Sequence, residues 1–482
     1  MASIKKYFND KGLLIRNWCA DNKSFLLVLI CLFVSLFISI YTVYALILVV
    51  LVLVAGAILF DFEKCLSFFM FCYSFEAVFY ITKNSKNTFV FPIVYSILFS
   101  IAFIKYIILL FKKKKKLNIK RLVPLALFII YILIPINPIK ISDVIKYVIA
   151  FGVLYLLLEY KDEINFNNVL IVASIGLVLS IIISPLLTFS NRMEYIQFAF
   201  YNQGIEKLKA VFVNPNWLAV YSIVMLSICC YKFVFNDLMW GFPILVVLPY
   251  TYRTISRDYI LCLIIVISFL LVVSIVKRKK TCFLKYIGVI VFIAVVALIQ
   301  LDVTNLYIIR VKNTYNEIVT LVGITSENGG TEEELKDETD DKSYNKDDNA
   351  SKWIDGTPID PGRAGLWKRY IRDYKSSPKK IIFGAGVSAD VLGIAPHNTY
   401  INILWQFGVV GSVALIGVFY LILRDLLKSK NVLSFLLLFI LSFICMFESN
   451  LFNYVAVMMI ILLFCSTHTG KKIGEIGEQA IE

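Results

Sequence analysis

Residues 360–370 read DPGRAGLWKRY, residues 381–387 read IIFGAGV, and residues 395–411 read APHNTYINILWQFGVVG. This stretch begins in a long polar segment and ends inside an apolar block, Thr399–Leu423, that has the length of a membrane helix. It contains His397, one of only two histidines in the chain. Because a polar segment rich in Arg, Gly and Trp meets a membrane helix here, we expect this stretch to carry the chemistry of the protein.

The composition around this stretch is that of a membrane protein. Of 482 residues, 59% are hydrophobic and 17% are charged, whereas a soluble domain is about 45–50% apolar and about 25% charged. The apolar residues form blocks of roughly 16–24 residues, enough to cross a bilayer core of about 30 Å. The alternating strands of a membrane barrel, roughly ten residues each, are not seen in the sequence. We therefore predict an all-α polytopic integral membrane protein with about 14 transmembrane helices.

These blocks divide the chain into three parts. Residues 1–300 hold the first eleven predicted helices, residues 301–398 form a large loop, and residues 399–482 hold the last three helices and a tail. The predicted membrane helices are Ser24–Ile40, Val43–Phe60, Cys65–Ile81, Thr88–Phe111, Arg121–Ile136, Ser142–Leu158, Asn168–Thr188, Asn216–Phe235, Leu238–Ser256, Asp258–Val276, Phe283–Gln300, Thr399–Leu423, Val432–Phe447 and Leu451–Cys465.

The distribution of positive charge predicts the orientation. The net charge of +14 would suit nucleic acid, but the basic residues gather in short loops, for example residues 112–116, 277–280 and 424–430. Lys and Arg are enriched in cytoplasmic loops, and with the N-terminus inside every basic cluster falls on the same side. We therefore expect no nucleic-acid partner, both termini in the cytoplasm, and the large loop outside.

Cysteine usage argues against a metal centre or a disulfide framework. The ten cysteines lie in or beside apolar blocks or in the N-terminal tail, and none lies in the long polar segment. We expect no metal and no cofactor.

The loops differ in composition. Residues 326–349 hold ten carboxylates against three lysines with almost nothing apolar, which predicts a mobile and dispensable insert. Residues 189–213 place aromatic and charged side chains at mixed helical spacing, which indicates a segment lying in the membrane interface. Alternating apolar and basic residues from Arg363 to Tyr374 predict a short helix over the membrane.

Two arginines lie at the outer end of a predicted span. Arg253 and Arg257 are four residues apart, so on a helix they would share a face. One interpretation is a pair of interfacial arginines reaching for lipid headgroups. The other is a clamp for an anionic ligand, because Arg binds phosphate oxygens bidentately. Their position outside, against the positive-inside pattern, favours the clamp.

The polar segment adds a third cation and an aromatic surface. Arg363 follows the turn Pro361-Gly362 and precedes Trp367 by four residues. It is either a solvated loop arginine or a further cation at the same site, with Trp367 as a flat surface for a sugar ring. Residues 384–386, Gly-Ala-Gly, are too few for a nucleotide fingerprint and predict a tight turn that lets the backbone pass closely.

The apolar block that follows begins with polar residues. Asn398 is a candidate N-cap, and Asn398, Asn402 and Gln406 recur every four residues as a polar stripe. His397 is either a satisfied interfacial histidine or, above such a stripe, part of a polar cavity. Glu448, between the last two predicted spans, is a solvated loop acid or a weaker candidate for the same site.

The order of these motifs resembles the O-antigen ligase/polymerase family over roughly residues 211–411. The motifs are Asn214-Pro215-Asn216 before one span, Ser256-Arg257 at the head of another, Gly362-Arg363-Ala364-Gly365-x-Trp367, Phe383-Gly384-x-Gly386 and His397-Asn398-x-Tyr400. The resemblance implies a GT-C-like glycosyltransferase of the bacterial cytoplasmic membrane with a metal-independent active site on its outer face. Loop arginines would hold the diphosphate of the donor, and the histidine would act on the acceptor.

The resemblance also implies the substrates and partners. We expect an enzyme that polymerises undecaprenyl-diphosphate-linked oligosaccharide repeats into a surface polysaccharide, with membrane lipids, a flippase and a chain-length regulator as partners. A ligase that transfers glycan to a lipid or another acceptor, and a flippase or transporter, are the alternatives. The expected catalytic residues are Arg257, Arg363 and His397, and the expected substrate-binding residues are Asn214, Asn216, Arg253, Trp367, Asn398, Tyr400, Asn402, Gln406 and Glu448.

Overall fold

The computed structural model describes residues 2–83, 86–113, 118–133, 141–189, 199–202, 205–212, 214–322, 362–386, 396–446 and 454–469. Its α-helices are α1 (Ala2–Asp21), α2 (Lys23–Ser39), α3 (Ala45–Leu59), α4 (Phe62–Tyr73), α5 (Phe91–Lys113), α6 (Ile119–Leu133), α7 (Ile141–Tyr160), α8 (Phe166–Ile183), α9 (Pro215–Phe235), α10 (Gly241–Tyr252), α11 (Arg257–Lys277), α12 (Lys280–Ile299), α13 (Leu301–Val322), α14 (Gly362–Lys375), α15 (Pro378–Phe383), α16 (Thr399–Ser429), α17 (Val432–Ile444) and α18 (Tyr454–Thr469). The shorter elements are the 3₁₀ helices η1 (Glu76–Phe79), η2 (Ser184–Phe189) and η4 (Leu238–Trp240), and the strands β1 (Tyr80–Lys83), β2 (Lys86–Phe89), β3 (Ala199–Asn202) and β4 (Ile205–Leu208).

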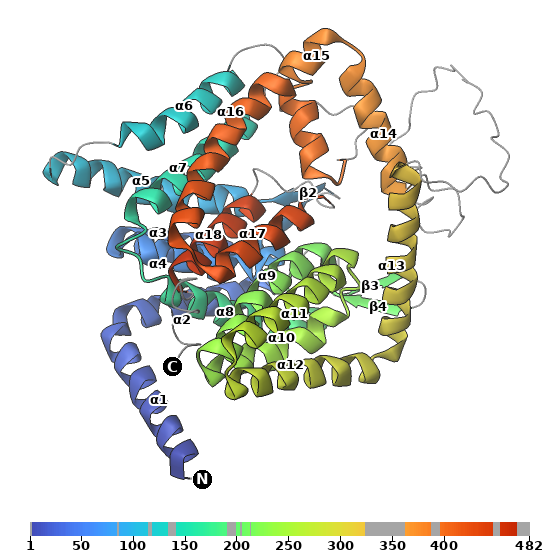
Figure 1. The fold of residues 1–482 in the computed structure, drawn as a ribbon. Helices are drawn as coiled ribbons and strands as arrows, with labels where there is room; N and C mark the ends of the chain where they lie inside the picture. The colour runs from blue at the N-terminus through green and yellow to red at the C-terminus, as the bar shows by residue number, and fades with distance from the viewer. Residues whose placement is uncertain are drawn as a thin grey trace, which may run out of the picture.

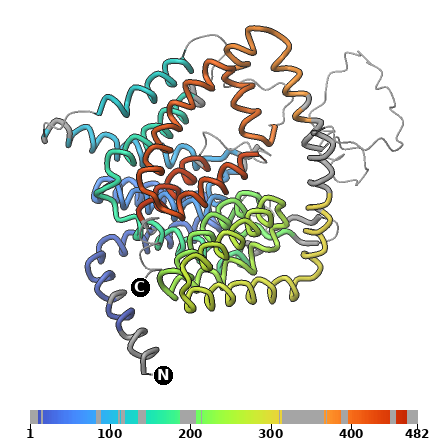
Figure 2. Tube along the Cα trace, viewed as in Figure 1, coloured from blue at the N-terminus to red at the C-terminus, as the bar shows by residue number. Residues whose placement is uncertain are grey.

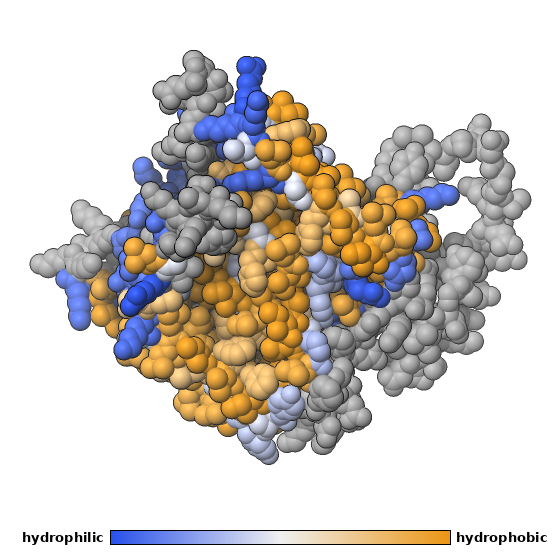
Figure 3. Space-filling model, turned by 90° about the horizontal axis from the view of Figure 1, so that it is seen from below, coloured by the Kyte–Doolittle hydropathy of each residue, from blue (hydrophilic) through white to orange (hydrophobic). Residues whose placement is uncertain are grey.

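The fold is a helical bundle suited to a membrane. Among the described residues, six helical segments are long and apolar enough to cross one, in α5, α8, α9, α11, α12 and α16, and a seventh if α2 and the part of α1 bent 84° from it count together. Four shorter apolar helical segments accompany them, and each of the predicted apolar blocks contains a helix. Figure 3 shows a broad apolar surface with hydrophilic residues gathered toward its edges. The prediction of a helical membrane protein is confirmed at this level.

The predicted span Cys65–Ile81 is wrong in its second half. Helix α4 has only 12 residues and ends at Tyr73, and the chain then forms η1 and the hairpin β1–β2. Beyond the helix, Ala77 N–H donates to Val211 O at 3.0 Å. This bond ties the end of α4 to the segment that leads into α9.

The loop at residues 189–213 contains strands that the sequence did not predict. Its described part includes an antiparallel hairpin, β3–β4, that pairs Ala199 with Leu208 and Asn202 with Ile205. The aromatic residues Phe200 and Tyr201 favour strand structure, and the position of this segment in the membrane interface stays a prediction. Leu208 N–H donates to Arg253 O at 3.0 Å, which attaches the hairpin to the end of α10.

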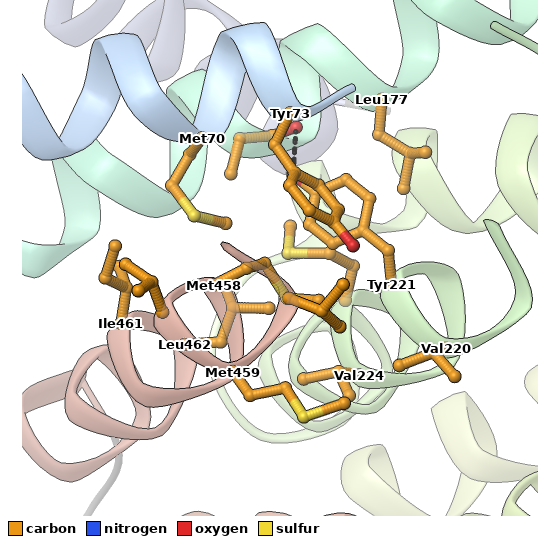
Figure 4. Packing of buried hydrophobic residues seen from close by; sticks show 14 of the residues in the cluster. Met70, Tyr73, Leu177, Val220, Tyr221, Val224, Met458, Met459, Ile461 and Leu462 are labelled. Atoms are coloured by element: carbon orange, nitrogen blue, oxygen red, sulfur yellow. Dashed lines mark hydrogen bonds between the residues drawn. The ribbon is translucent and has the colours of Figure 1, made fainter. Parts of the chain in front are cut away.

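The core lies where α4, α8, α9 and α18 meet. Tyr73 and Tyr221 are fully buried there, with ring centroids 5.1 Å apart and nearly perpendicular planes. Figure 4 shows Met70, Met458 and Leu462 packed around this pair. Side chains from both halves of the sequence fill this centre of the core.

Helix α16 is not the single straight span that the sequence predicted. Gly408 has φ 59° and ψ −167°, which breaks the helix into a short limb, residues 399–407, and a long limb, residues 409–429. Figures 1 and 2 show the chain turning sharply between the two limbs. The polar stripe of Asn398, Asn402 and Gln406 therefore belongs to the short limb and does not run down a continuous membrane helix.

Candidate functional site

The short limb of α16 is held by the two helices that precede it. Trp405 Nε1–H donates to Asp373 Oδ2 at 2.8 Å, and Lys380 Nζ lies 2.7 Å from Asp373 Oδ1. The ring of Tyr370, which is buried, meets Trp405 edge-on with centroids 4.9 Å apart. Asp373 on α14 thus joins α15 and α16, and the predicted helix Arg363–Tyr374 is confirmed as α14.

The charge of Asp373 matters for this junction. Partial burial raises the pKa of its carboxyl, but the hydrogen bonds from Lys380 and Trp405 and the charge of Lys380 outweigh burial and hold that pKa below its usual range. The ionised form is therefore the one that the folded protein favours.

The turn at residues 384–386 docks into the bend of α16, and the close backbone approach that the Gly-Ala-Gly sequence predicted is confirmed. Gly384 has φ 79°, and a Cβ atom there would overlap the carbonyl of Gln406; a Cβ atom on Gly408 would likewise overlap the backbone of Gly384. Only glycine allows this approach. The close approach allows two hydrogen bonds, because Ala385 N–H donates to Trp405 O at 2.7 Å and Gly386 N–H donates to Gln406 O at 3.0 Å. The two carbonyls released by the bend are satisfied in this way.

A tyrosine from α6 completes the bend. The hydroxyl oxygen of Tyr131 lies 2.8 Å from Phe383 O and 2.5 Å from Phe407 O. A hydroxyl has one proton to donate, so it serves one carbonyl at a time while lying between both. The bend is therefore a junction of α6, α15 and α16, and no pattern in the sequence indicated Tyr131.

His397 is positioned from both sides. Its backbone is left-handed, with φ 48°, and its side chain is half-buried. On one side, Trp367 Nε1–H donates to Pro396 O at 2.8 Å. On the other, Asn398 caps α16 by accepting Ile401 N–H at 3.0 Å, which confirms the predicted N-cap. Thr399 N–H donates to Cys445 O at 2.8 Å, so the end of α17 also holds this turn.

These bonds bring several predicted site residues together. Trp367 links α14 to residues 396–399, the His397 turn. Arg363 lies in the first turn of α14, four residues before Trp367. The side chain of Arg363 lies outside the described part. Tyr400 is the second residue of α16, and its hydroxyl donates to Ser442 O at 2.9 Å. Asn402 and Gln406 are half-buried on the same limb.

Arg253 and Arg257 do not share a helix face. Helix α10 ends at Tyr252, residues 253–256 form a turn in which Ile255 has φ 52°, and Arg257 begins α11. The four-residue spacing therefore does not place both side chains on one surface, and the helix-based argument is wrong. Arg253 Nη2 instead lies 3.6 Å from Asp302 Oδ2 on α13, and Arg253 Nε is buried without a hydrogen-bond partner among the described residues.

Packed helices link the segments that carry the two arginines to other parts of the candidate site. Tyr307 on α13 donates to Tyr252 O at 2.8 Å, beside Arg253, and α13 in turn contacts α14. Helix α11, which begins with Arg257, packs against α17, whose end accepts the bond from Thr399. These contacts relate the helices and do not place the side chains of Arg253 and Arg257 against His397.

The remaining predicted residues are Asn214, Asn216 and Glu448. Asn214 is the N-cap of α9 and accepts Asn216 N–H at 2.8 Å, so its side-chain oxygen stabilises the start of that helix. Glu448 and the acidic insert at residues 326–349 lie outside the described residues.

Sequence reasoning missed a buried charged pair near this region. Glu76 and Lys209 are 0% and 1% exposed. Burial lowers the pKa of Lys209 to about 8, and the nearby Glu76 carboxylate opposes that shift. Glu76 is the acid inside the apolar block Cys65–Ile81, and an acid within such a block was the signal that could have pointed to it.

Comparison with models of known protein families finds no match, and comparison with curated protein sequences also finds none.

Proposed function

We propose that the protein is a membrane glycosyltransferase that polymerises undecaprenyl-diphosphate-linked oligosaccharide repeats on the outer face of the bacterial cytoplasmic membrane. The proposal includes a GT-C-like bundle of about 14 spans with both termini in the cytoplasm. The observation that carries it is the His397 turn, which Trp367 ties to the helix that begins at Gly362-Arg363.

The reaction assigns a role to each group. The acceptor hydroxyl of one lipid-linked glycan attacks the anomeric carbon of another, and the carbon–oxygen bond to the diphosphate breaks. The hydroxyl proton goes to His397, since imidazole is the side chain best suited to accept a proton near neutral pH. The electron pair leaves with the lipid diphosphate, whose growing negative charge Arg257 and Arg363 stabilise.

The position of His397 supports the role of a base. It lies directly before the N-cap of α16. Its constrained backbone, joined to α14 and α17, limits where the imidazole is placed. A base must be positioned before it is useful, and such positioning contributes to the ~10²–10⁴-fold effect of general base catalysis.

The experiment uses the purified full chain in liposomes with undecaprenyl-diphosphate-linked oligosaccharide. We expect a ladder of products on a gel that grows by whole repeats. Arg363→Ala is expected to abolish the ladder, whereas Arg369→Ala, an exposed arginine on the same helix, keeps it. Transfer of glycan to a different lipid without a ladder would indicate a ligase, and an intact donor with no glycan transferred would contradict both.

A further inference from the structure

A cavity of about 440 Å³ lies in the angle between the two limbs of α16. The short limb contributes Ile403, and the long limb contributes Leu415 and Phe419. Phe151 of α7, Leu441 of α17 and Met459 of α18 complete the wall. The cavity depends on the bend at Gly408, because a straight α16 would not have two limbs facing it.

The walls of this cavity are almost entirely hydrocarbon, so water gains few hydrogen bonds inside it and an apolar ligand is favoured. On one side the lining includes Ile416 and Tyr420 of the long limb, which are 64% and 58% exposed. Since α16 is one of the helices suited to cross a membrane, lipid would contact these exposed residues, and the cavity would open toward it.

At its other end the cavity reaches the candidate site. Thr399, Tyr400 and Ser442 supply polar atoms to the lining, and Thr399 is two residues from His397. A molecule with its apolar chain in the cavity would therefore place its head beside His397. A hydrocarbon chain with a polar head, entering from the membrane, has this shape.

We propose that the cavity binds the isoprenoid chain of the lipid-linked substrate and presents its diphosphate to the His397 turn. The identity of the head rests on the proposed function, but the binding of the chain does not require that any sugar be transferred. The bend of α16 then serves the site directly, since Gly384 and Gly408 keep the two limbs apart.

A pair of matched substitutions tests the cavity. Ala456 on α18 lines it and is 8% exposed, so Ala456→Phe fills part of the space. Val413 on the long limb is 62% exposed and does not contribute to the lining. The measurement is the binding of sugar-free undecaprenyl diphosphate to the full chain in nanodiscs. We expect Ala456→Phe to weaken binding about tenfold, the effect of losing contact with one or two methylene groups, and Val413→Phe to bind like the wild type.

A second measurement on the wild-type protein does not depend on how the variants fold. A photoreactive isoprenoid diphosphate should attach to peptides of α7, α16, α17 or α18, and unlabelled undecaprenyl diphosphate should prevent this. Equal affinity of Ala456→Phe and wild type, attachment elsewhere, or equal competition by phosphatidylglycerol would overturn the proposal. Binding as expected with no polymer from the wild type would leave the chain site standing and contradict the proposed function instead.

Discussion

At the scale of single residues, His397 shows how surrounding contacts hold an unusual backbone conformation. A positive φ costs a residue other than glycine free energy unless its surroundings enforce it, and here the backbone has φ 48°. The surroundings are the bond from Trp367 to Pro396 O, the cap made by Asn398 and the bond from Thr399 to Cys445 O. Strain held in this way is typical of functional positions.

Asp373 gives a prediction that depends on pH. Its pKa in the folded protein lies below the usual carboxyl value, so its contribution to stability is present above that usual value and is lost as pH falls through the folded value. Asp373→Asn removes the ion pair with Lys380 and lowers the free energy of unfolding near pH 7 by about 1 kcal/mol or less. We expect the difference in melting temperature between the wild type and Asp373→Asn to shrink between pH 5 and pH 3 in detergent. A difference that stays constant over this range would show that the carboxylate does not hold α14 to α16.

Several of these residues followed from the sequence, and several did not. Asn398 was recognisable as a helix cap, because the capping residue and the helix it caps are adjacent in the chain; Asn214 was predicted to bind substrate, and its cap on α9 was not predicted. Arg253 and Arg257 were misplaced because a spacing of four residues means a shared face only within one helix, and Thr254 to Ser256 form a turn. Tyr131 could not be found, since the carbonyls it binds are more than 250 residues away.

At the scale of elements, the bend of α16 decides where the site and the cavity lie. A glycine inside an apolar block is tolerated in a straight helix, so Gly408 alone did not predict a break. The break arises from the contact with Gly384, which lies in a different part of the chain. The hairpin β3–β4 was missed for a related reason, because four-residue strands carry too short a pattern to distinguish from helix.

A glycine substitution in α16 tests the role of this bend. Gly408→Ala adds a methyl group where the Gly384 backbone lies, at a φ of 59° that alanine disfavours. We expect it to lower the free energy of unfolding by about 2 kcal/mol or more and to make α15 accessible to trypsin at Lys379 and Lys380. Gly417→Ala on the same helix is the control, because the nearest atom to the added methyl is Pro124 Cβ at 3.9 Å. Equal stability of the two variants would mean that α15 does not depend on the bend.

At the scale of the whole molecule, the positions of the helices were easier to predict than their shapes. Apolar blocks mark helices because a membrane requires every backbone group to be bonded within the helix, and each predicted block contains one. Their lengths were less accurate: α4 and α10 have 12 residues each, fewer than the roughly 20 needed to cross a bilayer core.

The orientation of the molecule is a prediction of the charge distribution. A reporter that is active only outside the cytoplasm should work when fused after Gly330 and fail when fused after Lys116 or at the C-terminus.

Deleting residues 327–348 in the same protein should leave polymer formation intact, because this acidic segment has no apolar anchor. Loss of polymer from the deletion variant at normal protein level would contradict this. For the reporter fusions, reversed signals would place Arg363 and His397 in the cytoplasm and would refute an outer active site.

The most direct test of the central claim is the product of a His397→Ala protein. We measure the length of glycan chains made from undecaprenyl-diphosphate-linked repeats, together with donor binding, and compare it with His468→Ala. His468 stacks on Phe166 at a ring distance of 4.8 Å in the last turn of α18, so its loss should leave chain length unchanged. The account predicts that His397→Ala binds the donor but makes only single repeats, a loss of ~10²–10⁴-fold in rate. Chains of wild-type length from His397→Ala at matched protein level would contradict it.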